Sequence, residues 1–181
     1  MSIRMRCPRI QRYAIGALFL PLLMGCVSKP NGNPAQKNMV AVLTAQDILR
    51  LPLEQGVTGY DQVARGLRSN ADFQVLRPEP PILKAATAIT LADGYVVSDA
   101  TIEDYKGERK LGLAFDRRKC FPLAQAAGVA GVEIGKAAPQ EHDNERGRTF
   151  TAERNGMLAI FSTVGPESDC VSSITLTQLG K

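Results

Sequence analysis

The sequence has no tryptophan and only one histidine, and aromatic residues make up 6% of its 181 positions. Without tryptophan, the chain lacks an indole platform on which a sugar ring could stack. The single histidine, His142, would have to serve any zinc site or Ser-His-acid triad, and the sequence has no Gly-x-Ser-x-Gly motif. Asp143 and Glu145 could join His142 around a metal ion, but one histidine is a weak ligand set. We therefore expect the segment around His142, residues 141–145, to be a solvated, charged loop.

Sequence signatures of common cofactors are also missing. The chain has no Gly-rich phosphate loop, no helical metal-binding motif and no internal repeat, so we expect no cofactor. Asp99 and Glu103 fall on one face of a strand expected over residues 95–105. Paired carboxylates can carry out acid-base chemistry on glycans, although such a sheet face is more often simply solvated. A hydrolase of cell-wall glycan or lipid that uses Asp99, Glu103 or His142 is therefore a minor alternative to a non-catalytic protein.

The apolar run near the start of the chain is too short to span a membrane. It covers eleven positions, Ala14 to Met24, whereas a membrane-spanning helix needs about 20. Four arginines and no acidic residue precede it, between Met1 and Tyr13. A basic segment followed by a short apolar run is typical of an export signal. We expect residues 1–25 to be a signal peptide that is removed.

The end of this segment, Leu23, Met24, Gly25 and Cys26, resembles the lipobox of bacterial lipoproteins, in which Leu and two small or medium-sized residues precede Cys. The resemblance implies that the Cys26 thiol receives a diacylglycerol, that the chain is cut before Cys26, and that the new amine is acylated, as with palmitate. Each buried methylene contributes roughly 0.8 kcal/mol, so several acyl chains hold a protein firmly. Because Val27 follows in place of the Asp that marks inner-membrane retention, the resemblance implies an outer-membrane protein that faces the periplasm. The alternative is an ordinary secretory signal.

The formal net charge of +4 belongs to the signal segment. Removing the four arginines at positions 4, 6, 9 and 12 from the 22 basic residues leaves 18, which equals the 18 acidic residues. A nucleic-acid-binding protein needs a basic face that contacts phosphates. The neutral mature chain therefore indicates no nucleic-acid partner.

Two of the four cysteines are expected to pair after export. Cys7 would leave with the signal peptide and Cys26 would carry lipid, which leaves Cys120 and Cys170 in an oxidising compartment. A bridge between them would close a loop of about 50 residues, worth roughly 4 kcal/mol in the chain-entropy model. The alternative, two free thiols in a metal or catalytic site, lacks the further ligands that zinc requires. The sequence therefore favours a Cys120–Cys170 disulfide.

A tether is expected to separate the anchor from the folded domain. Residues 27–38 contain two prolines, one glycine and no aromatic residue, a composition typical of a linker. We assign residues 26–39 to the lipidated cysteine and its tether, and residues 40–181 to a single periplasmic domain, because the mature length suits one domain.

The first part of this domain has the pattern of two helices. Thr44 begins the Thr-x-x-Asp spacing of a capping box and predicts a short helix over residues 45–50, which Pro52 would end. Thr58 begins the same spacing and predicts a second helix over residues 59–69, with its apolar residues on one face.

From residue 82 onward the pattern is mostly that of strands. Asp93-Gly94 and Asn155-Gly156 are strong hairpin signals. Pro122 and the apolar residues after it predict a central helix that Gly128 ends, and Cys120 would lie at its entrance. The expected strands cover residues 83–91, 95–105, 111–115, 149–153, 157–163 and 170–179.

These elements predict an α+β fold, with two short N-terminal helices followed by three strands, a helix and three strands. The strands would form an antiparallel sheet of about six, with helices on one face and a disulfide as a staple. Two helices before an antiparallel meander are similar to the β-lactamase-inhibitor-protein-like folds of some small envelope lipoproteins, a resemblance that concerns topology alone.

Together these features favour a non-catalytic, lipid-anchored periplasmic protein that binds another protein. It would be an accessory of an envelope or secretion assembly, or alternatively an immunity protein or inhibitor that neutralises a toxin or hydrolase acting in the periplasm. Loops on a rigid scaffold often carry binding residues, so we expect the partner at residues 135–148 and 164–169. The candidate contact residues are His142, Asp143, Glu145, Arg146, Glu167 and Asp169.

Overall fold

The computed structural model describes residues 43–136 and 147–180. The elements in chain order are α1 (Ala45–Gln55), α2 (Val57–Asn70), β1 (Phe73–Arg77), β2 (Ile82–Ala85), β3 (Ile89–Thr90), β4 (Val96–Tyr105), β5 (Glu108–Phe115), β6 (Phe121–Pro122), α3 (Leu123–Ala130), a 3-10 turn η1 (Ile134–Lys136), β7 (Thr149–Arg154), β8 (Met157–Thr163) and β9 (Cys170–Gln178).

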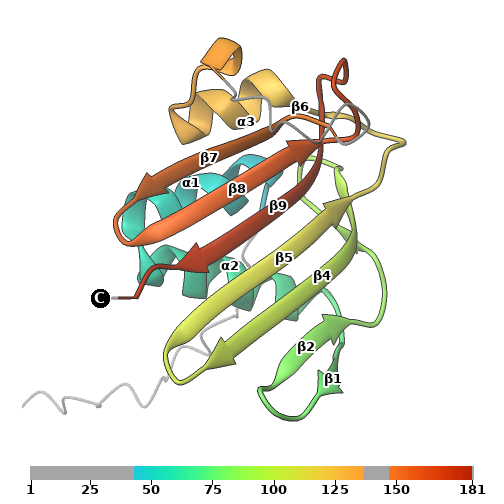
Figure 1. The fold of residues 1–181 in the computed structure, drawn as a ribbon. Helices are drawn as coiled ribbons and strands as arrows, with labels where there is room; N and C mark the ends of the chain where they lie inside the picture. Colours follow the sequence, from blue (N-terminus) through green and yellow to red (C-terminus); the bar gives the residue numbers. More distant parts are fainter. Residues whose placement is uncertain (1–42, 137–146, 181) are drawn as a thin grey trace, which may run out of the picture. The chain divides into compact units, whose positions relative to one another are not determined.

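The strands form one antiparallel sheet in the order β1-β2-β4-β5-β9-β8-β7, while β3 pairs with β4 and β6 pairs with β9. Helices α1 and α2 lie behind the sheet in the view of Figure 1. Buried side chains of all three α-helices join those of the sheet in one hydrophobic core, so the helices cover the same face. The expected α+β fold is confirmed, with nine strands in the described residues in place of about six.

The capping box of α1 is present, but the helix is longer than expected. The Asp47 amide donates to the Thr44 hydroxyl over 3.1 Å, and the Asp47 carboxylate accepts from the Thr44 amide over 3.2 Å. Burial works to raise the pKa of Asp47, but hydrogen bonds from Arg50 and Thr44 outweigh it and hold the pKa below its usual value. The expected end before Pro52 was wrong, because Pro52 and its neighbour Leu53 are buried in the helix and their packing offsets the missing amide donor.

Helix α2 follows almost without a loop. Its N-cap is Gly56, at φ +60°, and makes no side-chain capping bond, so the capping box expected at Thr58 was wrong. Gly59 lies against α1, where a Cβ atom would approach the Leu51 carbonyl oxygen to 2.0 Å. The close contact between the two helices therefore requires glycine at this position.

Several strand and helix boundaries also differ from expectation. The single strand expected over residues 83–91 is divided into β2 and β3, and the short strands β1 and β6 were not expected. Helix α3 continues past Gly128 to Ala130, and Gly131 ends it in the left-handed conformation at φ 70°. Because the buried face of α3 includes Ala130, packing extends this helix by two residues beyond the first glycine.

The expected disulfide is confirmed and ties the central helix to the last strand. Cys120 and Cys170 are bonded, with their Cα atoms 5.0 Å apart. Cys120 directly precedes β6, and Pro122 in β6 pairs with Cys170 in β9. The bridge therefore holds the start of α3 at the start of β9.

The second expected hairpin is also confirmed, and its turn contacts α1. Asn155 has the left-handed backbone φ of 51°, and Gly156 follows at 73°. The Asn155 side-chain amide donates to the carbonyl oxygens of Leu53 and Glu54 over 2.8 and 2.9 Å. These bonds satisfy carbonyl groups that the last turn of a helix leaves free.

Candidate functional site

The candidate contact residues from the sequence are described only in part. Four of them lie outside the described residues, namely His142, Asp143, Glu145 and Arg146, as does Cys26, the expected lipidation site.

The two candidates in the β8–β9 loop are Glu167 and Asp169, and both are exposed. Asp169 forms an ion pair with Arg148 over 2.8 Å, and Arg148 also donates to the Ser168 carbonyl oxygen over 2.7 Å. The start of β7 therefore holds this loop in place.

Asp99 and Glu103 lie on the same face of the sheet, as expected, but their surroundings differ. Asp99 forms an ion pair with Lys84 of β2 over 2.7 Å, and both side chains are more than 40% exposed. Glu103 lies two residues beyond Thr101, opposite Lys110 of β5. The structure therefore gives one of the two carboxylates a cationic partner and leaves the other beside a groove.

This face of the sheet, opposite the helices, is called the open face below. Within the described ranges, no helix packs on it (Figure 1). The strand register arranges its side chains across β4, β5, β9, β8 and β7 in three rows, Asp99–Ala114–Ser173–Ser162–Thr149, Thr101–Gly112–Thr175–Ile160–Thr151 and Glu103–Lys110–Thr177–Leu158–Glu153. Neutral, mostly small side chains fill its centre, and the charged ones lie toward its margins.

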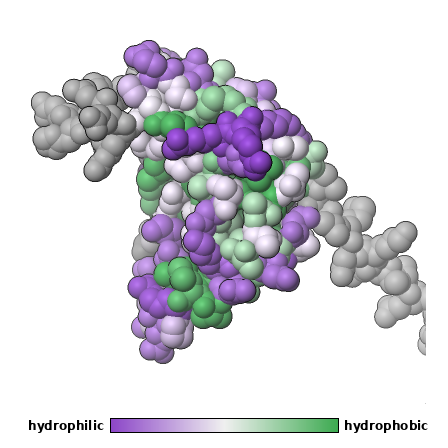
Figure 2. Space-filling model, turned by 90° about the vertical axis from the view of Figure 1, so that its right-hand side faces the viewer, coloured by the Kyte–Doolittle hydropathy of each residue, from purple (hydrophilic) through white to green (hydrophobic). Residues whose placement is uncertain are grey.

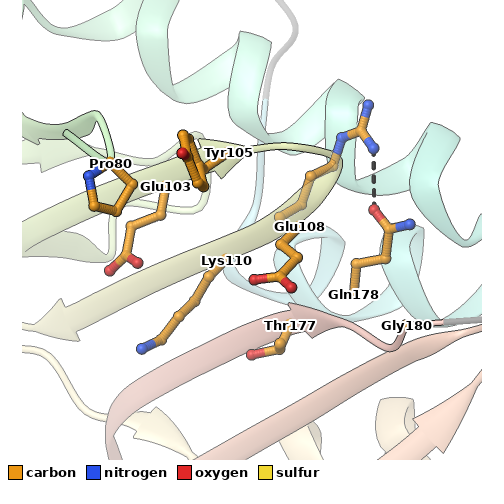
Figure 3. A pocket seen from close by; sticks show the side chains of 9 residues that line it. Pro80, Glu103, Tyr105, Glu108, Lys110, Thr177, Gln178 and Gly180 are labelled. Atoms are coloured by element: carbon orange, nitrogen blue, oxygen red, sulfur yellow. Dashed lines mark hydrogen bonds between the residues drawn. The ribbon is translucent and has the colours of Figure 1, made fainter. Parts of the chain in front are cut away.

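A groove of about 260 Å³ lies at one end of the open face, beside the β4–β5 hairpin. In Figure 3, the side chains of Glu103, Glu108, Lys110 and Thr177 lie along it, with Tyr105 next to Glu103. The complete lining is Pro80, Glu103, Tyr105, Glu108, Arg109, Lys110, Thr177, Gln178 and Gly180. The groove therefore crosses from the β1–β2 loop over β4 and β5 to β9.

Three charged side chains of this groove have no partner among the described residues. Glu103, Glu108 and Lys110 make no side-chain hydrogen bond or ion pair there. Arg109, in contrast, contacts Asp61 over 3.2 Å and donates to Gln178 over 3.0 Å. The groove therefore offers two free carboxylates and one free ammonium group to an incoming molecule.

Helix α2 fixes the backbone beneath these charges. The buried Tyr60 hydroxyl donates to the Lys110 carbonyl oxygen over 3.0 Å. Loss of hydration on burial raises the pKa of Tyr60, and the nearby Asp104 carboxylate raises it further. Tyr60 therefore remains a neutral hydrogen-bond donor, and it holds β5 against α2 at the groove.

The sequence interpretation missed most of this groove. It identified Glu103 but none of Tyr105, Glu108, Lys110 and Thr177. The alternation of side chains on both sides of the Lys106-Gly107 turn places Tyr105, Glu108 and Lys110 on one face. This pattern could have identified them from the sequence. The contribution of β9 could be found only from its pairing with β5.

The described residues contain no group of three or more His, Cys, Asp or Glu side chains that could hold a metal ion. None of the helices in residues 43–136 and 147–180 has the length and hydropathy of a membrane-spanning segment. No family model, no curated protein and no solved structure matches this chain.

Proposed function

We propose that this chain is a non-catalytic lipoprotein, anchored in the outer membrane and facing the periplasm, that binds another protein as an accessory of an envelope or secretion assembly. The lipobox-like segment at Cys26 supports the anchor and the location. The groove at the end of the open face supports the binding role.

The observation that carries this proposal is the set of unpaired charges in the groove. Glu103 and Glu108 are free to meet basic side chains, and Lys110 is free to meet an acidic one. A partner of complementary charge gains specificity from such contacts, whereas a mismatched partner leaves charges buried without compensation. The neutral centre of the open face next to the groove allows close contact without further desolvation of charge.

The same site favours binding over hydrolysis. The minor alternative, a hydrolase, would use Asp99, Glu103 or His142. The ion pair between Lys84 and Asp99 occupies one of these carboxylates. A binding protein requires no such catalytic pair, and the mixed charges of the groove suit a protein surface.

Crosslinking in intact cells tests the binding role. The full-length chain and an E103K/E108K variant would be crosslinked in the native envelope, purified and identified by mass spectrometry. We expect one envelope protein to be recovered with the parent chain and at least tenfold less of it with the variant, since like charges directly opposed at an interface repel. The matched control is E153K, which reverses a charge on the same face but on β7, two strands beyond β9, where the groove ends; it should recover the partner as the parent does.

Two results would contradict the proposal. Equal recovery with E103K/E108K would remove the groove from the interface, and turnover of isolated cell wall or lipid by the purified chain would favour the hydrolase.

Capture that requires secreted proteins of a competing strain, and that E103K/E108K abolishes, would identify the partner as an incoming toxin and the chain as its inhibitor.

A further inference from the structure

Strand β1 exposes two large apolar side chains at an edge of the sheet. Val75 is 64% exposed and Leu76 is 63% exposed, more than any other large apolar residue described. Figure 2, which views the molecule from the side that carries β1, shows a hydrophobic patch surrounded by hydrophilic surface. Exposed apolar residues on an edge strand favour pairing with another strand.

Along this edge, the backbone of β1 has hydrogen-bonding groups without a partner in residues 43–136 and 147–180. The Ala86 amide donates to the Asp72 carbonyl oxygen over 2.8 Å, and Gln74 pairs with Lys84 two positions further along. Hydrogen-bonded pairs alternate along an antiparallel ladder, so Asp72 and Gln74 use their backbone groups on β2. Phe73 and Val75 therefore point their amide and carbonyl groups toward the open edge.

The charges at the two ends of β1 are complementary to those of an antiparallel copy of β1. Asp72 precedes the strand and Arg77 ends it, with no charged residue between them. Both are exposed, and neither forms an ion pair within the described part of the chain. The β-bulge between Val75 and Arg77 brings Arg77 to the same face as Gln74 and Asp72. An antiparallel copy therefore places its own Asp72 beside Arg77 and its own Arg77 beside Asp72, whereas a parallel copy brings like charges together.

The other edge strand, β7, lacks these properties. It carries exposed Glu153 and Arg154, and Arg154 donates to the Ala130 carbonyl oxygen over 3.3 Å. Charged side chains on an edge strand oppose pairing with a further strand. Of the two edges, only β1 combines exposed apolar residues with an uncharged central stretch.

We propose that β1 pairs with β1 of a second copy of this chain, antiparallel and across a two-fold axis at Gln74. Each Phe73 then lies opposite Val75 of the second copy, and the free backbone groups of both residues form four hydrogen bonds. The two sheets become one continuous sheet, and each copy covers the exposed Val75 and Leu76 of the other. This interface shares no residue with the groove lining and does not depend on the proposed function.

A disulfide crosslink tests the register. The two Gln74 residues form a non-hydrogen-bonded pair, in which Cα atoms lie about 4.5 Å apart, within the range of disulfides. In the full-length chain, Q74C should give a covalent dimer on a non-reducing gel after mild oxidation. The parent chain and T151C, an exposed position in β7, should give at least fivefold less dimer. Equal crosslinking of T151C, absence of the Q74C dimer, or a Q74C adduct with a different protein would overturn the proposal.

Charge exchange tests the orientation. In the Q74C background, D72R and R77D should each reduce dimer formation about fivefold, because each change turns two attractive contacts of the symmetric pair into repulsive ones. The combined D72R/R77D chain exchanges the two signs and should restore the parental yield. A combined variant as weak as the single ones would contradict the antiparallel pairing.

Discussion

Asn155 joins two parts of the chain that are about one hundred positions apart, because its side chain donates to the Leu53 and Glu54 carbonyl oxygens. Its backbone is also in the left-handed region that the hairpin turn requires. The Asn-Gly pair predicted the turn from local chemistry alone. The cap on α1 could not be predicted, since it depends on how β7 and β8 pack against that helix.

Replacement of Asn155 should separate these two roles. We expect N155A to lower the free energy of unfolding by about 2 kcal/mol, because it removes two hydrogen bonds and places a Cβ-bearing residue without a local bond in the left-handed region. N155G keeps the backbone freedom and should cost about 1 kcal/mol. Urea denaturation followed by circular dichroism measures both. Equal losses would show that backbone strain contributes nothing, and no loss in either would show that the cap contributes nothing.

Among the candidate residues, too, those marked by local sequence could be predicted, and those placed by strand pairing could not. Cys120 and Cys170 were identified from compartment and count, and the structure confirms their bond. Glu103 was identified from alternation within one strand. Lys110 and Thr177 were not, because their position beside Glu103 follows from the pairing of β5 with β4 and β9.

At the scale of elements, the burial of side chains determined which helices and strands could be predicted from the sequence. Helix α2 was predicted because its buried residues Tyr60, Val63, Ala64 and Leu67 recur on one face. Strand β1 was missed because four of its five residues are exposed, so no alternation of apolar and polar positions marks it. The ends of α1 and α3 were misplaced because tertiary packing outweighs the local effects of Pro52 and Gly128.

The disulfide links β9 to the segment that begins β6. Because β6 consists of only two residues, its pairing with β9 makes few other contacts. We expect the C120S/C170S variant to lose about 3 kcal/mol of unfolding free energy, because its unfolded chain is no longer constrained by a closed loop. Urea denaturation of the variant, and of the parent chain under reducing conditions, should give similar midpoints. A variant as stable as the oxidised parent would contradict this expectation.

At the scale of the whole molecule, the expected tether of residues 26–39 lies between Cys26 and Leu43, the first core residue among those that the structure describes. Lipidation at Cys26 and folding of the domain are therefore expected to be independent.

The C26S variant tests this independence. We expect the parent chain to partition into the detergent phase and to incorporate labelled palmitate, and C26S to do neither, because three acyl chains bind a membrane far more strongly than the domain surface does. Its thermal midpoint should match that of the parent domain. Sedimentation of C26S with membranes would contradict the anchor.

Strand β9 lies in the middle of the sheet, between β5 and β8, although it is the last described strand in the chain. The strands before it form two separate ladders, one that ends at β5 and one made of β7 and β8, and among the described strands only β9 joins them. Pairing over such long sequence separations is slow. A chain that is threaded through a membrane from its amino end presents β9 last. If the chain is exported as proposed, this order of strands would delay completion of the sheet until β9 has crossed, and would keep the chain competent for export until then.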